Sequence, residues 1–313
     1  MTDIRPKRPS WLKVKAPTSK GYFEIKDMLG ELNLVTVCQE ALCPNMGECW
    51  EGGTATFMLM GDTCTRACRF CAVNTGNPKG ILDHDEPIKV GTAISKMDLN
   101  YVVLTSVDRD DLEDSGSDHF AKTIEVIKEN NSKMIVEVLT PDFSGNEDHI
   151  RRVVQAKPDV FAHNIETVEE LTKRVRDRRS GYAQSLKVLE LVKKIDPTRY
   201  TKTSIMLGLG EKDEQVLKTL KDLRAVGCDV VTFGQYLAPT KRLARHLPIF
   251  EYATPEKFKY WEETAKEMGF LYVASGPLVR SSYKAGEFFM KGMIESDRKK
   301  QDSNLFPTLN DLR

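Results

Sequence analysis

The chain has 313 residues, with 46 basic and 46 acidic side chains and a formal net charge of zero. This balance excludes a generally basic protein that coats nucleic acid, and it excludes a generally acidic one. Hydrophobic residues make up 40% and charged residues 29%, which is the composition of a folded chain with a sizeable core. No apolar run is long enough for a membrane helix. Neither nucleic acid nor a membrane is therefore an expected partner.

From residue 54 onward, short apolar runs alternate with amphipathic segments. The alternation predicts strands at 54–60, 101–106, 134–139, 160–164, 204–207 and 229–233. It predicts helices at 117–129, 146–156, 182–195 and 214–226, with Ser117 and Asn146 as N-caps and Gly227 just after the last helix. Parallel neighbours need crossover connections, which are usually helical. Six such repeats predict an α/β fold, an open (β/α)6 partial TIM barrel.

The ends of the chain extend this barrel. Residues 1–53 form an expected N-terminal extension, residues 54–250 the barrel, and residues 251–313 a C-terminal extension with a helix at 254–268 and a strand at 270–275. The N-terminus shows no apolar signal segment and no Ser- and Arg-rich amphipathic presequence, which favours a cytoplasmic location.

Six of the seven cysteines form two triplets, Cys38-x4-Cys43-x5-Cys49 and Cys64-x3-Cys68-x2-Cys71. So few cysteines in an odd number favour ligands over disulfide bonds, in a reducing compartment. Structural zinc and a redox dithiol are the simpler alternatives, but three thiolates do not close a four-ligand zinc site. Three thiolates on a four-iron cluster leave one iron open for an external ligand. The Cys64 loop follows the first predicted strand directly, which places it at the carboxyl end of the barrel.

The second triplet, with Phe70 before its last cysteine, resembles the signature of the radical S-adenosylmethionine (SAM) superfamily. The resemblance implies a radical SAM partial barrel in which Cys64, Cys68 and Cys71 hold a [4Fe–4S] cluster, and SAM binds its fourth iron. One electron from that cluster then cleaves SAM to a 5′-deoxyadenosyl radical. The cofactor carries the difficult chemistry, and the protein positions it.

Both triplets together resemble the lipoyl synthase family, and the likeness covers essentially the whole chain. It is carried by the segments 8–13 (RPSWLK), 43–50 (CPNMGECW), 56–61 (TFMLMG), 105–112 (TSVDRDDL), 139–143 (LTPDF), 163–167 (HNIET), 204–211 (SIMLGLGE), 233–237 (FGQYL) and 280–283 (RSSY). Members of this family insert two sulfur atoms at C6 and C8 of an octanoyl chain on a carrier-protein lysine. The resemblance implies two [4Fe–4S] clusters and SAM as cofactors, with the second, auxiliary cluster consumed as sulfur donor.

The resemblance assigns Cys38, Cys43, Cys49 and Ser282 to the auxiliary cluster. Counting thiols alone nominates Cys228 instead of Ser282, but Cys228 lies where a helix ends and a strand begins, a setting typical of a small buried residue. A hydroxyl ionises less readily than a thiol, so a serine ligand would release its iron more easily. The alternative is that this serine only caps a turn.

Other residues are assigned with simpler alternatives beside them. Phe70 flanks the adenine of SAM or only packs. Thr105, Ser106, Asn164 and Glu166 stand at strand ends, where they contact SAM or cap loops.

Five basic residues fall within positions 173–179, and Arg178 and Arg179 are expected to orient the substrate carrier if it presents an acidic face. A solvated helix end is the alternative. The implied partners are octanoylated lipoyl-carrier domains, namely E2 subunits of 2-oxoacid dehydrogenases and the glycine cleavage H protein. A flavodoxin or ferredoxin is the implied electron donor.

Three other classes compete with this interpretation. One is another radical SAM enzyme with an auxiliary cluster, such as a methylthiotransferase or a peptide-modifying enzyme. The others are a ferredoxin-like electron carrier and a zinc-stabilised binding module. An electron carrier does not need a βα barrel of this length, and a methylthiotransferase would need larger flanking domains than this chain provides.

Overall fold

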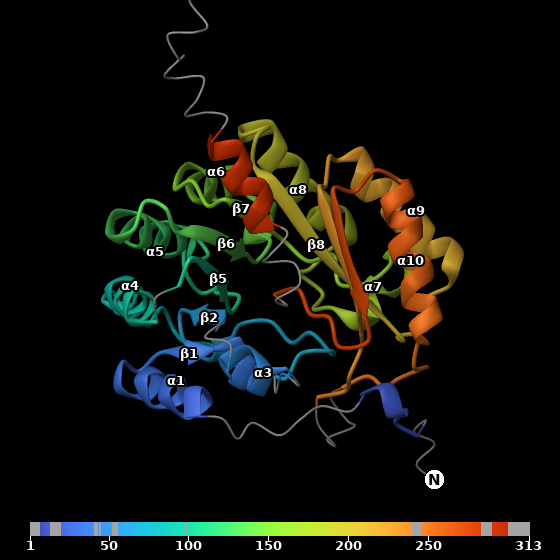
Figure 1. Ribbon diagram of the computed structural model, residues 1–313, viewed down its shortest axis with the longest axis horizontal. Coiled ribbons are helices and arrows are strands. Elements are labelled where there is room, and N and C mark those ends of the chain that lie inside the picture. Colours follow the sequence, from blue (N-terminus) through green and yellow to red (C-terminus); the bar gives the residue numbers. More distant parts are fainter. Residues whose placement is uncertain are drawn as a thin grey trace, which may run out of the picture.

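The computed structural model describes residues 7–12, 20–40, 43, 45–51, 56–97, 99–239, 246–282 and 290–299. In this part of the chain one curved sheet has the strand order β1-β2-β5-β6-β7-β8-β9-β10 (Figure 1). Its strands are β1 (Val35–Thr36), β2 (Thr56–Leu59), β5 (Tyr101–Ser106), β6 (Ile135–Leu139), β7 (Val160–Ala162), β8 (Tyr200–Leu207), β9 (Val230–Gln235) and β10 (Tyr272–Gly276). A separate short pair joins β3 (Thr63–Cys64) to β4 (Asn74–Thr75).

All neighbours from β2 to β10 are parallel, and only β1 runs antiparallel to β2. Within the described residues β1 and β10 are the two edges and do not pair, so the predicted open partial barrel is confirmed. The strands are apolar on consecutive positions because both faces of a parallel sheet are covered. One detail differs from expectation. The strand assigned to the C-terminal extension is β10, which pairs with β9 and continues the barrel sheet.

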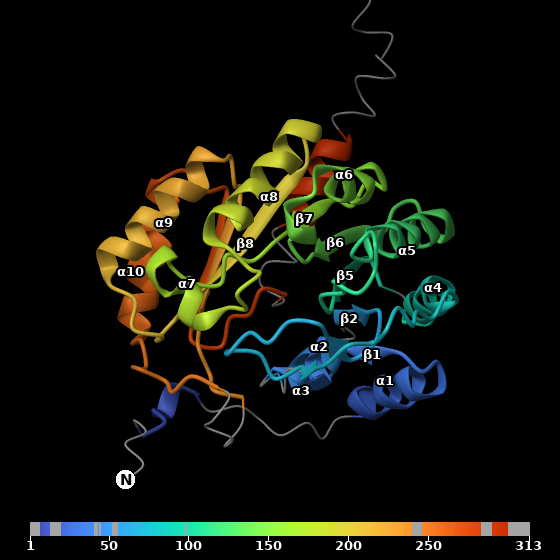
Figure 2. The ribbon, with the colours of Figure 1, turned by 180° about the vertical axis from the view of Figure 1, so that it is seen from behind.

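Helices cover the convex side of this sheet (Figures 1 and 2). The predicted ones are α5 (Ser117–Asn130), α6 (Glu147–Gln155), α8 (Tyr182–Ile195), α9 (Asp213–Ala225) and α10 (Pro255–Glu267). The helices that the periodicity did not predict, wherever they lie, are η1 (Ser10–Leu12), α1 (Lys20–Glu31), α2 (Val37–Glu40), α3 (Met46–Glu51), α4 (Glu86–Lys96), η2 (Phe143–Gly145), α7 (Glu169–Val175) and the helix at 290–299. The elements η1, α2, α3, η2 and α7 have seven residues or fewer, which is too short for a clear helical period.

Two of the three predicted helix boundaries are correct. The side chain of Asn146 accepts from the backbone N–H groups at the start of α6, and Gly227 follows α9 with a φ of 77°. Ser117 is not an N-cap. It is the first residue of α5, and Gly116 before it has a φ of 82°. A side chain there would also collide with Met60, whose sulfur lies 2.2 Å from the Cβ position.

The amino ends of the strands are covered by the helix at 290–299. Met290 and Ile294 pack against Tyr101, Val160 and other residues near the strand starts. Arg298 also donates to Asp159 at 2.7 Å. This helix closes the end of the barrel at which the strands begin. The opposite end, where the strands finish, is left for a site. None of the helices described here has both the length and the apolar character needed to span a bilayer.

Candidate functional site

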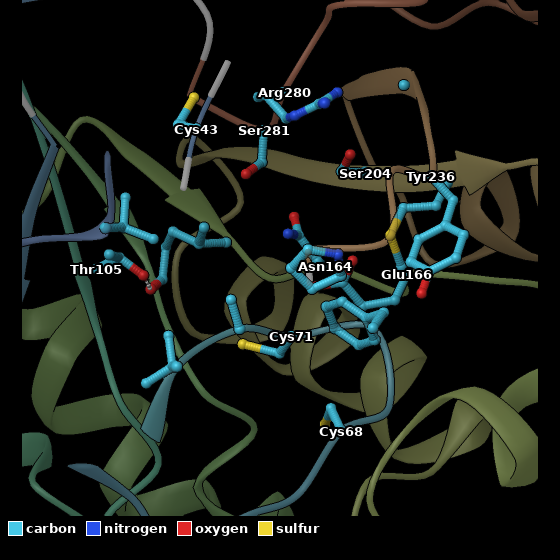
Figure 3. Close-up of a pocket in the computed structure, with 18 of the residues that line it drawn as sticks. Cys43, Cys68, Cys71, Thr105, Asn164, Glu166, Ser204, Tyr236, Arg280 and Ser281 are labelled. Carbon is cyan, nitrogen blue, oxygen red and sulfur yellow. Dashed lines mark hydrogen bonds between the residues drawn. The ribbon is translucent and has the colours of Figure 1, made fainter. Parts of the chain in front are cut away.

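A cavity of about 630 Å³ lies at the carboxyl ends of the strands. Thiols from both triplets line it, from Cys38 and Cys43 to Cys64, Cys68 and Cys71. Figure 3 shows Cys43 with Arg280 and Ser281 on one side of this space and Cys68 and Cys71 on the other. Segments far apart in the sequence therefore converge on one volume.

The second triplet is held by backbone amides. The sulfur of Cys64 accepts from the N–H groups of Arg66 and Asp108, both at 3.4 Å, and that of Cys68 accepts from Asp177 at 3.2 Å. Burial raises the pKa of both thiols, Cys64 and Cys68, to about 12. Buried thiols of this kind ionise readily only beside a positive centre, and a coordinated metal deprotonates them outright. The donor set and the amides around it fit an iron–sulfur cluster.

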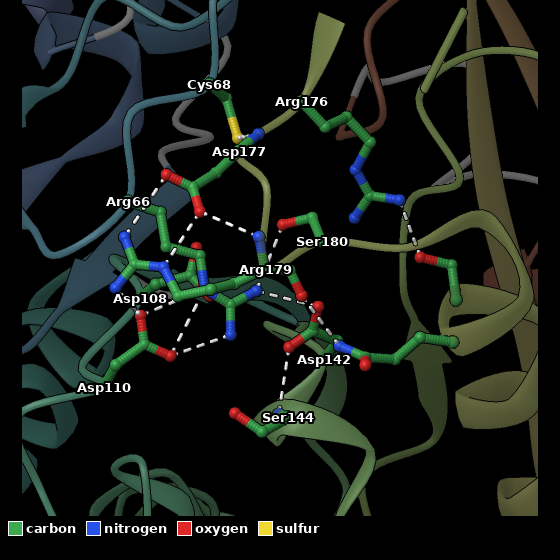
Figure 4. Close-up of polar contacts among 12 residues, drawn as sticks. Arg66, Cys68, Asp108, Asp110, Asp142, Ser144, Arg176, Asp177, Arg179 and Ser180 are labelled. Carbon is green, nitrogen blue, oxygen red and sulfur yellow. Dashed lines mark hydrogen bonds and ion pairs between the residues drawn. The ribbon is translucent and has the colours of Figure 1, made fainter. Parts of the chain in front are cut away.

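A buried arginine fastens this loop to the barrel (Figure 4). The side chain of Arg66 is 3% exposed and pairs with Asp110 at 2.8 Å, Asp142 at 2.7 Å and Asp108 at 3.3 Å. Asp108 and Asp110 follow β5, and Asp142 follows β6. Burial raises the pKa of Asp108 to about 6, although Arg66 opposes the shift. One cation thus links the cysteine loop to two strand ends.

The basic run near residue 176 divides into different roles. Arg176 is buried and donates to Ser185 at 2.7 Å. Arg179 pairs with Asp177 at 2.9 Å and donates to the carbonyl of Thr65 at 2.6 Å, beside the cysteine loop. Arg178 is exposed. Neither Arg178 nor Arg179 lines the cavity, and their role toward a carrier stays a prediction.

The residues expected to contact SAM all line the cavity. The hydroxyl of Thr105 is already used, because it donates to the carbonyl of Leu139 at 3.0 Å. The Oγ of Ser106 and the Oδ1 of Asn164 are buried without a hydrogen-bond partner among the described residues. Such groups are costly unless a ligand satisfies them, so their positions fit a polar molecule in the cavity.

Glu166 has a positive φ of 67°. Its N–H donates to the carbonyl of Ser204 at 3.0 Å, and its own carbonyl accepts from Met206 at 2.9 Å. These bonds to β8 hold an unfavourable backbone conformation that is typical of functional sites. Burial raises the pKa of the Glu166 carboxyl. Phe70 packs with the cluster around Tyr236 at the cavity wall.

The first triplet lies on the opposite wall. Cys38 and Cys43 line the cavity, whereas Cys49 is buried and is not part of the cavity lining. Ser281 and Ser282 line the cavity as well, together with Arg280. Cys228 lies elsewhere, fully buried among the hydrophobic residues under β8 and β9. None of the seven cysteines is in a disulfide bond, and in the described part of the chain no three His, Cys, Asp or Glu side chains converge on one metal-ion position.

Sequence reasoning assigned no role to Arg66 or to the aspartates around it. A signal was available, because Asp108, Asp110 and Asp142 follow two predicted strands whose carboxyl ends share the edge of the cysteine loop. Three carboxylates close together at such an edge need a compensating positive charge. Arg66, which lies between two of the cysteines in the sequence, is a cation that can supply it. Asn45, whose side chain donates to the carbonyl of Leu278, was also assigned no role.

Comparison with known proteins points to one family. The profile of the radical SAM superfamily matches residues 58–223, and that of the N-terminal domain of lipoyl synthase of the Radical_SAM family matches residues 2–43. The chain is 61% identical to a mitochondrial lipoyl synthase of Culex quinquefasciatus, over 93% of this chain and 77% of that protein. It is 56% identical to the one of Drosophila melanogaster, over 97% and 81%.

Among solved structures, methylornithine synthase aligns with a TM-score of 0.56 and 11% identity, over 82% of this chain and 71% of that one. This likeness supports the fold. The names of the relatives also correct one expectation. Both are mitochondrial proteins, so the expectation of a cytoplasmic location is wrong.

Proposed function

The chain belongs to the lipoyl synthase family of the radical SAM superfamily, and from this premise we propose that its cavity is where two sulfur atoms enter C6 and C8 of a protein-bound octanoyl-lysine. The observation that supports this proposal is the shared cavity itself. Thiols of both triplets and the serines of the 280–283 motif line one volume, so one acyl chain can reach both groups.

The two triplets have unequal tasks. Cys64, Cys68 and Cys71 would hold the SAM-binding cluster, and Cys38, Cys43, Cys49 and Ser282 the auxiliary one. When bound, the first cluster with SAM supplies one-electron chemistry that breaks unactivated C–H bonds, and the second supplies sulfur. No side-chain acid or base is needed for such bonds.

The protein itself binds, orients and excludes water. Ser106 Oγ and Asn164 Oδ1 would receive the polar groups of SAM, because both are buried and unsatisfied. Arg66 keeps the cysteine loop at a constant position against β5 and β6. Apolar side chains such as Met58 and Leu139 line the cavity and would exclude water from the acyl chain.

The substrate carriers and the electron donor are finer proposals. A lipoyl synthase acts on lipoyl-carrier proteins, and we assign E2 subunits and the H protein to this role, with a flavodoxin or ferredoxin as reductant. Arg178 and Arg179, whose side chains are exposed, are the residues of the basic run that we assign to contact with an acidic carrier.

One experiment tests the proposed function. The reconstituted protein is incubated anaerobically with SAM, a reductant and a peptide that carries an octanoylated lysine. Mass analysis should find a product with two added sulfur atoms, together with 5′-deoxyadenosine. Formation of 5′-deoxyadenosine without any sulfur-containing product, on peptide and intact carrier alike, would contradict the proposal.

A further inference from the structure

Asn45 connects two segments that both line the cavity. It lies between Cys43 and Cys49, directly before α3, and is only 4% exposed. Its side-chain Nδ2 donates to the carbonyl of Leu278 at 2.6 Å, across 233 positions of sequence. Leu278 stands four residues before Ser282, at the start of the segment that carries both serines.

The segment 277–282 is also held from its other side. The N–H of Val279 donates to the carbonyl of Gly276 at 3.1 Å, which forms a turn directly after β10. The carbonyl oxygen of Val279 lies 2.3 Å from the position that a Cβ of residue 234 would occupy. The segment can approach β9 this closely only because Gly234 has no side chain. It is therefore held between β9 and Asn45.

Asn45 also belongs to the backbone frame of the first triplet. Its carbonyl accepts from the N–H of Cys49 at 2.9 Å, and the carbonyl of Cys38 accepts from the N–H of Cys43 at 3.0 Å. One residue thus contacts the frame of the three thiols through its backbone and the serine segment through its side chain.

We propose that Asn45 is a positioning residue, a latch that holds Ser282 at the distance from the first triplet that lets its hydroxyl complete the auxiliary cluster. This inference rests on the proposed function, because it concerns the ligand set of that cluster. A hydroxyl is a weaker iron ligand than a thiolate, so it depends more on being held in place.

The simpler alternative is that Asn45 only caps α3. A capping asparagine accepts backbone N–H groups with its side-chain oxygen, and aspartate caps equally well. The bond to Leu278 uses the amide nitrogen, which aspartate lacks. Asn45→Asp therefore preserves a cap and removes the latch. Asn146→Asp is the matched control, because the side chain of Asn146 caps α6 through its oxygen.

The experiment compares the reconstituted wild type, Asn45→Asp and Asn146→Asp under anaerobic conditions. Iron per chain, Mössbauer spectra and the rate of iron loss to EDTA are measured beside SAM cleavage. We expect Asn45→Asp to lose auxiliary-cluster iron roughly five- to tenfold faster, the factor that one buried hydrogen bond controls. SAM cleavage should persist, which also shows that the barrel has folded. Equal rates of iron loss in all three proteins, or loss of both clusters together in Asn45→Asp, would refute the latch.

A rescue makes the test specific. In Asn45→Asp with Ser282→Cys, a thiolate that binds iron more tightly should restore iron retention without restoring sulfur transfer. Failure of the double variant to retain iron would also refute the latch. Ser282→Ala distinguishes the assignment of Ser282 as an iron ligand from the role of Asn45 in holding it. If it leaves the auxiliary cluster unchanged, the ligand assignment fails and the latch with it. If it loses the cluster while Asn45→Asp does not, only the latch fails.

Discussion

Replacement of Arg66 by methionine should destabilise the loop that carries the second cysteine triplet. The side chain of Arg66 is 3% exposed and that of Asp142 is fully buried, with 2.7 Å between their charged atoms. Methionine keeps much of the apolar stem but leaves Asp108, Asp110 and Asp142 without their shared cation. Removal of one partner from a buried ion pair costs about 3–5 kcal/mol. The folded-to-unfolded ratio should therefore fall on the order of a hundredfold or more.

Urea unfolding of the metal-free protein, followed by circular dichroism, measures this loss. Arg151→Met is the matched control. Arg151 pairs with Glu147 at the surface, with side chains 41% and 51% exposed, and such a pair contributes about 0.5 kcal/mol or less. After reconstitution, Arg66→Met should also form far less 5′-deoxyadenosine than this control, because the thiols of the second triplet are no longer held together.

The direction in which Asp142→Asn changes stability distinguishes a loss of charge compensation from a loss of packing. Asp142→Asn alone should destabilise the protein, since it weakens the pair with Arg66. In the Arg66→Met background the same change should stabilise it, because it removes an uncompensated buried charge. If Arg66→Met unfolds within about 1 kcal/mol of Arg151→Met, or if Asp142→Asn destabilises both backgrounds equally, the electrostatic reasoning is wrong.

Three further predictions concern the site. Cys68→Ala should abolish 5′-deoxyadenosine formation, whereas Cys43→Ala should keep it and form no C–S bond; identical behaviour by product analysis would contradict the division of tasks. Burial, reinforced by the charge of Arg176, lowers the pKa of His163 to about 4 from 6.5. The unfolded state then binds the proton more readily, so stability should fall by roughly 3 kcal/mol from pH 6.5 to 4, and His163→Gln should flatten that part of the urea-unfolding profile. Arg178→Glu should lower the turnover of the carrier substrate and reduce the salt dependence of that turnover, without affecting SAM cleavage. Arg179→Glu should lower carrier turnover and SAM cleavage alike. Unchanged turnover across a salt series in the Arg178 variant would reject the docking role.

Local patterns in the sequence predicted most of the barrel. The strand at 101–106 and the helix at 182–195 have the predicted bounds, and Asn146 caps its helix as expected. Short helices such as α3 and α7 were missed, because fewer than two turns give no clear period. The strand near residue 272 was found, but its membership of the barrel sheet was not, since strand pairing is not written in local periodicity.

The chemistry of the site was readable from sequence for a similar reason. A loop of eight residues with three thiols defines its own ligand set, because such spacing needs no distant partner. The amino-acid sequence by itself therefore determined the βα repeat, the ligand set of the second triplet and the family resemblance. Only the tertiary structure decided that Cys43, Ser281 and Cys68 share one cavity, that Arg66 gathers three carboxylates, and that Asn45 reaches Leu278. Those contacts depend on the curvature of the whole sheet, which brings together residues as distant in sequence as Asn45 and Leu278, 233 positions apart.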